Sequence, residues 1–175
     1  MSESRSCAGS ITRTLKAMTA IFSGIDTDDL ARVLASGTDH GGNPIEPFVD
    51  DDGGWPLRCC LGASVPGDRI AIVAWAPMPW NGPYAEVGPI VVHTDGCAGV
   101  VDATRLPTEL DGRRMVLRPY GHDRMIAYHR VRRVAAGDSL TAHVHELLAH
   151  EAVDFVHGRN VTGGCYAFTA TATRP

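Results

Sequence analysis

The segment RIAIVAWA, residues 69–76, constrains the fold more than any other part of this chain. It is a continuous apolar run of strand length that follows the turn-forming tripeptide Pro66-Gly67-Asp68 and precedes a proline-containing loop. Such a run predicts a strand that is apolar enough to lie centrally in a sheet. The chain is therefore expected to be organised around a β-sheet.

Other segments have the composition of strands and are separated by residues that favour turns. In chain order they are residues 11–19, 89–93, 115–120, 124–131, 152–157 and 165–172. The pair at 115–120 and 124–131 is joined by three residues, which is short enough for a hairpin. The stretch 37–56 is dense in Gly, Pro, Asp and Asn and predicts a long loop.

Two segments have the pattern of amphipathic helices. The first opens at Thr27, whose side chain can cap a helix, and Gly37 can end it. The second starts at Asp138 or Ser139 and runs to about His150, with apolar residues at helical spacing. Together with the strands they predict the α+β class, as a single domain with a mainly antiparallel β-sheet and two principal helices.

The length and composition are those of one globular domain. The chain has 175 residues, of which 44% are hydrophobic and 21% charged. Its polar start predicts a disordered leader over residues 1–10, followed by the domain over residues 11–175. This start lacks the apolar core of a signal peptide, and no apolar run reaches the length of a membrane span. We therefore expect a cytoplasmic protein whose five cysteines are reduced.

The charge pattern bears on the class of partner. A net charge of -4 gives no reason to expect a nucleic-acid partner, which needs a basic face. The basic run at 130–133 is too short to predict binding to an anionic membrane. Lys16 is the single lysine among 16 basic residues, which indicates a GC-rich bacterial genome. The expected partner is a small-molecule substrate or ligand, and the oligomeric state stays open.

Two stretches bring histidine and cysteine together at the end of a predicted strand. They are VVHTDGC at 91–97 and FVHGRNVTGGC at 155–165. If the strands that end at His93 and His157 are neighbours, both imidazoles lie at the same end of the sheet. A thiol reacts as a thiolate, which needs a base or a positive environment, and Arg159 supplies positive charge beside Cys97 or Cys165.

These residue types predict acid–base or nucleophilic chemistry without a cofactor. In this interpretation Cys97, or with less support Cys165, is the nucleophile or general acid, and the two histidines are acid–base groups. The candidate catalytic residues are His93, Cys97, His157, Arg159 and Cys165. The candidate substrate-binding residues are Arg58, Arg118, Tyr120 and Asn160. Arg58 needs an anionic partner, which is either an aspartate of the 50–52 run or an acidic ligand.

Metal binding is the alternative. His93, Cys97, His157 and Cys165 are the right ligand types for a tetrahedral zinc ion, although their spacing is not that of a zinc finger. A catalytic metal would instead use two histidines with Asp95 or Glu86. The histidines at 143, 145 and 150 lack the i, i+4 spacing of a metalloprotease helix. The adjacent Cys59 and Cys60 are expected to point to opposite sides of a strand and to pack in the core.

Four motifs occur in an order that resembles a known family. They are FVDDDGGWPLRCCL, YAEVGPIVVHTDGCAG, VLRPY followed by Asp123-Arg124, and VHGRNVTGGCYAF. The order resembles the bacterial domain-of-unknown-function family 1203, from about residue 14 to the last strand. The family pattern falls on Arg58, Cys59, Cys60, His93, Cys97, Arg118, Tyr120, His157, Arg159 and Cys165. This chain departs from it at Gly164, where members commonly carry an aromatic residue, and at Asp95-Gly96, where an acidic residue and Pro are frequent.

The resemblance implies no established activity, so the function is predicted from the residues. The first hypothesis is a small-molecule enzyme of the isomerase, cyclase, lyase or hydrolase type, in a biosynthetic pathway. The second is a non-catalytic metal- or ligand-binding protein with His and Cys ligands, with zinc or another transition metal as its ion. In a third interpretation the His and Cys motifs only stabilise strand ends.

Overall fold

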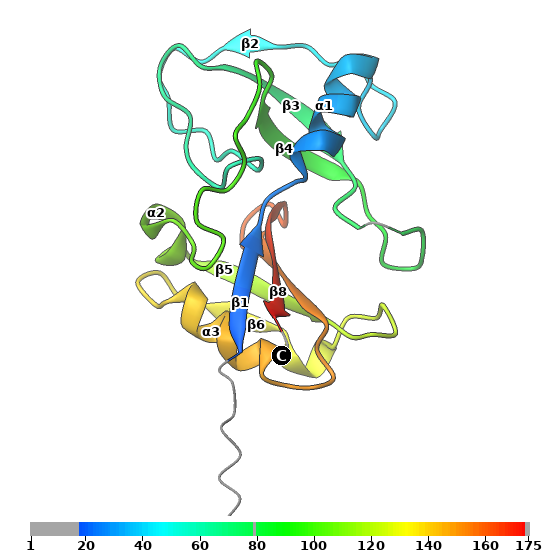
Figure 1. Ribbon diagram of the computed structural model, residues 1–175, viewed down its shortest axis with the longest axis vertical. Coiled ribbons are helices and arrows are strands. Elements are labelled where there is room, and N and C mark those ends of the chain that lie inside the picture. The colour runs from blue at the N-terminus through cyan, green and yellow to red at the C-terminus, as the bar shows by residue number, and fades with distance from the viewer. Residues whose placement is uncertain (1–17, 79, 174–175) are drawn as a thin grey trace, which may run out of the picture.

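The computed structural model describes residues 18–78 and 80–173 and has two antiparallel sheets (Figure 1). The described strands are β1 Thr19–Ser23, β2 Phe48–Val49, β3 Arg69–Trp75, β4 Gly88–His93, β5 Met115–Tyr120, β6 Arg132–Val134, β7 Phe155–Asn160 and β8 Tyr166–Thr173. The described helices are α1 Thr27–Ser36, α2 Thr108–Asp111, α3 Leu140–Leu148 and the 3-10 helix η1 Tyr128–Arg130. None of these helices is long and apolar enough to cross a membrane.

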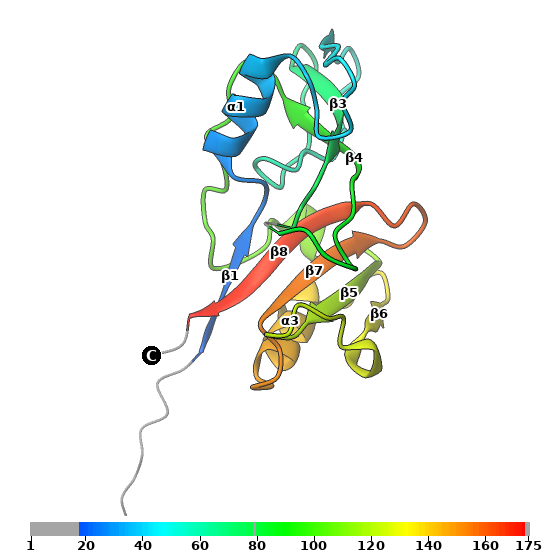
Figure 2. The same cartoon turned by 90° about the vertical axis from the view of Figure 1, so that its right-hand side faces the viewer.

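The larger sheet has the order β1-β8-β7-β5-β6, and α3 covers one of its faces (Figure 2). Ser139 caps α3 by accepting a hydrogen bond from the backbone N–H of Ala142. The apolar stripe of α3 is buried at Leu140, Val144, Leu147 and Leu148. These side chains pack against Leu117, Val156, Phe168 and other residues of the sheet to form the main core.

The smaller sheet has the order β2-β3-β4 and lies with α1 above the larger one in Figure 1. The predicted central strand is confirmed, because β3 pairs with β2 on one side and with β4 on the other. Its register places Ile70 opposite His93. A second core lies between this sheet, α1 and the 57–60 segment, and contains Leu30, Leu57, Cys59, Ile70 and Val92 among others.

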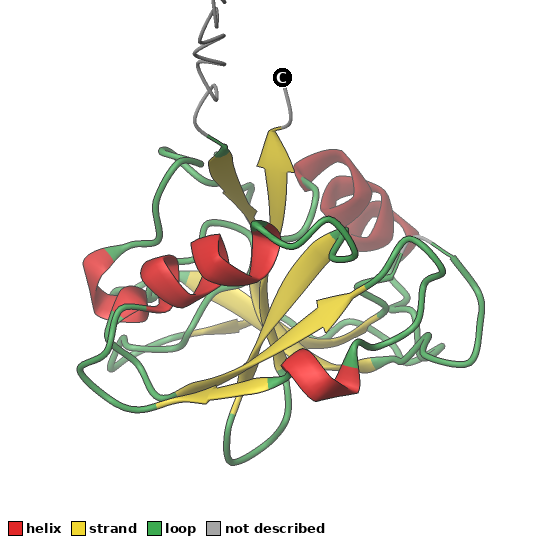
Figure 3. Cartoon of the chain, turned by 90° about the horizontal axis from the view of Figure 1, so that it is seen from below, coloured by secondary structure: helices red, strands yellow, loops and turns green. Residues whose placement is uncertain are grey.

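The two sheets meet around the start of β8. Tyr166 begins this strand of the larger sheet, yet its side chain belongs to the core of the smaller one. Leu57 forms a parallel bridge with Val91 of β4. Seen from below, the strands lie in the middle of the molecule and the helices lie on its outside (Figure 3).

The predicted fold class is confirmed, with one change in the sheets. The α+β class, the antiparallel pairing and the two principal helices agree with the structure, but the strands form two sheets. The cap of α1 is Asp26, whose carboxylate accepts from the N–H groups of Asp28 and Asp29, and Thr27 is already the first helical residue. Gly37 ends α1 in the left-handed conformation as expected.

The predicted hairpin after β5 is wrong in its second strand. The regular ladder of β5 is with β6, at Arg132–Val134, and residues 124–131 contribute one isolated antiparallel bridge, between Tyr120 and Ile126. The carboxylate of Asp123 accepts from Met125 N–H, Arg124 is left-handed, and Ala127 N–H donates to Pro119. These turn interactions bend the segment into η1 before it can run as a strand.

Two other predictions concern the start of the chain. The predicted strand at 11–19 lies almost wholly outside the described residues, and the described strand β1 begins at Thr19. The predicted leader at 1–10 lies outside them as well. The division into a leader and one domain over residues 11–175 stays a prediction.

Candidate functional site

The loop of residues 56–63, called the CC loop here, positions the adjacent cysteines. Its ends are joined by a bridge between Pro56 and Ala63, and Leu57 N–H donates to the carbonyl of Gly62. Arg58 N–H donates to Val91 of β4 at 2.9 Å, and the carbonyl of Arg58 accepts from Ile25 N–H at 2.8 Å. The CC loop is therefore fixed between the edge of the smaller sheet and the segment that leads into α1.

The backbone is strained beside Cys60. Leu61 has a φ of 63° and is one of two non-glycine residues with positive φ among those described. The left-handed conformation costs an L-residue about 1–2 kcal/mol. Such strain persists where the surrounding structure holds it, and it is common at functional sites. Here it lies directly after the two adjacent cysteines, whose thiols are directed to the same place.

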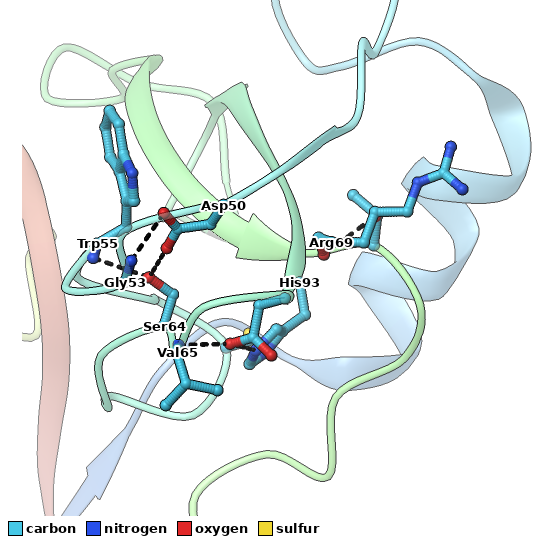
Figure 4. A network of polar contacts seen from close by, with 10 residues as sticks. Asp50, Gly53, Trp55, Ser64, Val65, Arg69 and His93 are labelled. Carbon is cyan, nitrogen blue, oxygen red and sulfur yellow. Dashed lines mark hydrogen bonds and ion pairs between the residues drawn. The ribbon is translucent and has the colours of Figure 1, made fainter.

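His93 ends β4 and faces both the CC loop and the turn before β3 (Figure 4). Its Nδ1 lies 3.5 Å from Sγ of Cys59, and its Nε2 lies 3.3 Å from Oδ2 of Asp68. The same carboxylate oxygen accepts from Val65 N–H at 2.8 Å. Asp68 precedes β3 directly, so the pairing of β3 with β4 brings it opposite the end of β4.

Three thiols and one imidazole form a compact group, called the thiol–imidazole cluster here. Its members are Cys59, Cys60, His93 and Cys97. One potential ligand atom from each lies within 4.8 Å of the others. Tetrahedral zinc has bonds of about 2.3 Å to sulfur and about 2.0 Å to nitrogen, which places a sulfur and a nitrogen about 3.6 Å apart. The Cys59–His93 separation of 3.5 Å fits that geometry.

The thiols of the cluster bias one another's ionisation. A hydrogen bond with Cys59 lowers the pKa of the Cys60 thiol, and the charge of His93 acts in the same direction. The same hydrogen bond, followed by burial, raises the pKa of the Cys59 thiol. The first negative charge in the cluster is therefore favoured on Cys60. All four cysteines of the described residues are free of disulfides, so all three thiols here are available as ligands.

The expected ion pair of Arg58 with an aspartate of the 50–52 run is wrong. Asp50 instead accepts from the hydroxyl of Ser64 and from Gly53 N–H, as Figure 4 shows. Arg58 is only 7% exposed and donates from Nε to the carbonyl of Tyr166 at 2.6 Å and from Nη1 to that of Pro56 at 2.9 Å. It has no carboxylate partner among the residues that the structure describes.

A second group of polar side chains lies on the face of the larger sheet opposite α3. It is called the arginine cluster here and consists of Arg118, Tyr120, His157 and Arg159, with Glu86 from the loop before β4. Arg118 is the cross-strand neighbour of His157, and Arg118 and Tyr120 share a face as predicted. Glu86 forms ion pairs with both arginines, at 3.3 Å from Arg118.

His157 is held as a neutral imidazole in the arginine cluster. It is 1% exposed, and the ring centroids of Tyr120, Phe155 and Tyr166 each lie 5.1 Å from its own. Burial, and then the positive charges of Arg159 and Arg118, lower its pKa well below 6.5. Its Nδ1 accepts from Nη2 of Arg159 at 3.3 Å. A neutral, enclosed imidazole of this kind positions Arg159 and is poorly placed to exchange protons with solvent.

Cys165 and Asn160 lie in the β7–β8 turn, between the two sheets. Cys165 borders two cavities, one of about 160 Å³ shared with Arg159 and Glu86 and one of about 290 Å³ shared with Arg58 and Asn160. The side-chain oxygen of Asn160 accepts from two backbone N–H groups of the turn, at Thr162 and at residue 163. Asn160 thus shapes the turn, and among the described residues its side chain has no hydrogen bond to an imidazole.

A larger cavity lies elsewhere. It measures about 670 Å³ between α1, the end of β3 and the loop that follows. Trp75, Trp80 and His40 line it, and His40 packs on Trp75 with ring centroids 4.5 Å apart. Neither the thiol–imidazole cluster nor Cys165 borders it. No cysteine lines this cavity, whereas the thiol–imidazole cluster and the surroundings of Cys165 both contain thiols.

The predicted convergence of the two His-Cys motifs is wrong. β4 and β7 belong to different sheets, so His93 and His157 are not at one sheet end. His93 and Cys97 join Cys59 and Cys60, whereas His157 and Arg159 join Arg118 and Tyr120. The four-ligand set of His93, Cys97, His157 and Cys165 is therefore not assembled. Asp95 and Glu86 pair with arginines and form no metal-binding group with two histidines in the described part of the chain.

Sequence reasoning missed Cys59, Cys60 and Asp68 as members of the site. The opposite orientation expected for adjacent cysteines holds for a strand, but these two lie in a turn. The available signal was the turn itself, since Gly62 and Pro66-Gly67 follow the cysteines closely. Only the tertiary structure shows that both thiols meet one imidazole.

Comparison with known proteins places the chain in a family without assigning a reaction. No curated protein and no solved structure shows significant similarity to it. One family model matches residues 54–171, which include the CC loop, both His-Cys motifs and the arginine cluster. The match begins well after residue 14, where the sequence resemblance was expected to start. The chain belongs to the family described as protein of unknown function, DUF1203.

Proposed function

We propose that this protein binds a transition metal ion, zinc by the chemistry of its donors, at Cys59, Cys60, His93 and Cys97. The observation that carries the proposal is the mutual proximity of four potential ligand atoms, all within 4.8 Å. Three thiolates and one imidazole are a common donor set for structural zinc. The ligands come from segments separated by more than thirty residues, so this grouping depends on tertiary packing.

The surroundings of His93 support a ligand role. A metal-binding histidine usually donates its second ring N–H to a carboxylate, which fixes the tautomer and orients the ring. Asp68 occupies that position at Nε2, while Nδ1 faces the thiols. Among the other described histidines, His122 also has a carboxylate at one ring nitrogen, but it faces no thiol.

Four protein ligands leave no open coordination position, which is typical of a structural site. An ion here would tie together the CC loop, the end of β4 and the chain after it. Residues 94–107 contain no regular helix or strand, so cross-linking them to β4 would restrict their conformations. A cytoplasmic location, where thiols stay reduced, is part of the same proposal.

Metal analysis of untagged protein tests the proposal. We expect about one zinc ion per chain by elemental analysis, as for other four-ligand sites. Cys59→Ser and Cys97→Ser should each lose most of it, whereas Cys165→Ser, a thiol outside the cluster, should retain it. Protein that stays metal-free after refolding with zinc, or that binds equally well without Cys97, would rule the site out.

The small-molecule hypothesis is favoured by a different observation. Under the metal proposal His93 and Cys97 are ligands and not acid–base groups, so any organic ligand must bind elsewhere. The crevice beside Cys165 has cavities, buried cations and a thiol, and it shares no lining residue with the metal site.

A further inference from the structure

Arg58 is a buried cation without a counter-charge. It is 7% exposed, and both of its described hydrogen bonds go to backbone carbonyls, which carry no net charge. A buried guanidinium usually has an anionic partner, because removing an ion from water costs several kcal/mol. The structure therefore has an unmet requirement for negative charge at this place.

The neighbouring arginines do not supply it. Arg118 and Arg159 share one carboxylate, that of Glu86, and Arg159 is 4% exposed with no partner for its Nε. The guanidinium groups of Arg58, Arg118 and Arg159 thus have a single carboxylate, that of Glu86, among the ion pairs described for them. Glu109 borders a further cavity with Arg58, but the two form no ion pair.

The two buried arginines hold the backbone on either side of Cys165. Arg58 donates to the carbonyl of Tyr166, and Arg159 donates from Nη1 to that of Gly164 at 3.4 Å. Gly164 has a φ of 69°, a conformation that an L-residue adopts only with strain. This arrangement fixes the thiol at the border of both cavities, and the thiol is partly exposed to them.

The cavity that Arg58 and Cys165 share has the size and walls of a small-molecule site. It measures about 290 Å³, at the lower end of the range for ligand pockets. Apart from Arg58, Asn160 and Cys165, its walls are apolar or aromatic side chains: Trp55, Pro56, Ile72, Pro89, Ile90 and Val91. Apolar walls with one buried cation suit an organic acid better than a strongly hydrated inorganic anion.

We propose that this cavity binds a small organic carboxylate, with the guanidinium of Arg58 against the carboxylate and the thiol of Cys165 beside its apolar body. None of the residues that line this cavity is a proposed metal ligand. In this proposal Arg58, Asn160 and Cys165 bind the ligand. Arg159 has a positioning role, because it donates to the backbone carbonyl of Gly164.

Alkylation of Cys165 by a charged and a neutral reagent tests the proposal. Iodoacetate and iodoacetamide react alike: a thiolate sulfur forms a bond to carbon, the carbon–iodine bond breaks, iodide leaves, and the thiol proton goes to solvent. Iodoacetate carries a carboxylate, whereas iodoacetamide is neutral. The tryptic peptide that begins at Asn160 contains Cys165 as its single cysteine, so mass spectrometry reports this thiol alone.

We expect the ratio of iodoacetate rate to iodoacetamide rate at Cys165 to exceed that of N-acetylcysteine by on the order of tenfold, the effect of one nearby positive charge at intermediate dielectric. Arg58→Gln should reduce the ratio to the reference value, and Arg58→Lys should retain part of it. Arg133→Gln removes the same charge from an exposed position on β6 and should change nothing. A wild-type ratio equal to the reference, or one unchanged in Arg58→Gln, overturns the proposal.

A protection experiment on the wild-type chain covers the case in which Arg58→Gln does not fold. Millimolar propionate or benzoate should slow the reaction of Cys165 with iodoacetamide several-fold, whereas propionamide or benzamide should not. Phosphate at equal ionic strength should protect less than either acid. Equal protection by phosphate identifies a general anion site and overturns the organic-acid proposal, as does an absence of protection by every anion.

Discussion

His93 and Asp68 face each other across the end of β4, with Nε2 of the imidazole 3.3 Å from Oδ2 of the carboxylate. Because a carboxylate only accepts, Nε2 donates to Asp68, and Nδ1 faces the Sγ of Cys59. Several hydrogen-bond and charge effects keep the pKa of Asp68 low, first among them the backbone N–H of Val65. The pair thus prepares the imidazole to act as a ligand before any ion arrives.

Replacing Asp68 should weaken metal binding without removing a ligand. Asp68→Asn keeps an acceptor for Val65 N–H but removes the negative charge beside His93. We expect zinc affinity to fall about 10- to 100-fold, the usual effect of losing an outer carboxylate. Competition with a chromophoric chelator measures it. Asp95→Asn, at an exposed carboxylate 4.0 Å from Arg69, is the control, and equal affinities in the two variants would contradict this role.

Removing Glu86 should cost more stability than removing an exposed carboxylate of similar type. Glu86→Gln leaves the buried Arg159 and the half-buried Arg118 without their anion. Because Glu86 itself is 37% exposed, we expect a loss of about 1–3 kcal/mol in the free energy of unfolding, below the value for a fully buried pair. Glu146→Gln, which breaks an exposed pair with Arg132, should change the free energy of unfolding little. Urea unfolding distinguishes them, and equal losses would count against a buried charge cluster.

The buried His157 should make stability depend on pH near neutrality. The unfolded chain binds a proton at this residue below about pH 6.5, whereas the folded chain does not because its pKa is lowered. This residue's contribution is therefore fully present above that pH and is lost as the pH falls. The titratable or charged groups around it are Arg118 and Tyr120 from β5, Arg159 from β7, Tyr166 from β8 and Glu86 from the loop.

His157→Gln should flatten the fall in unfolding free energy between about pH 7.5 and about pH 5.5, because glutamine does not titrate. His150→Gln, at an exposed position after α3, should leave the slope nearly as it is. Because thiol protonation and metal release act in all three proteins, the comparison of slopes isolates the histidine. Identical slopes for wild type and His157→Gln would show that this imidazole binds a proton as readily in the folded chain as in the unfolded chain.

Gly24 should be intolerant of any side chain. An added Cβ would lie 2.2 Å from the carbonyl oxygen of Arg58, where Ile25 N–H already donates. Gly24→Ala must displace the CC loop, and we expect it to cost about 1–3 kcal/mol, as over-packing does. Gly112→Ala, where a Cβ meets open space at a negative φ, is the matched control and should change stability little. Thermal unfolding of both variants decides between them.

Local sequence patterns predicted the helices and strands well where capping or turn-forming residues mark their ends. The run at 69–76 became the central strand β3, and Ser139 and Gly37 mark helix ends as their side chains or backbone freedom predict. Local patterns failed at residues 124–131, where an aspartate-based turn and a left-handed Arg124 outweigh β propensity. Turn chemistry depends on a few hydrogen bonds, which the apolar pattern does not record.

The sequence by itself determined the α+β class, the family membership and the His, Cys and Arg residues available for a site. Only the tertiary structure decided which of those residues meet. The separation of β4 and β7 into two sheets divided the two His-Cys motifs, and the packing of the CC loop against the end of β4 placed two of its thiols beside His93. The physical reason is that periodicity reports which side of an element is buried, whereas the partner across the core is set by long-range packing.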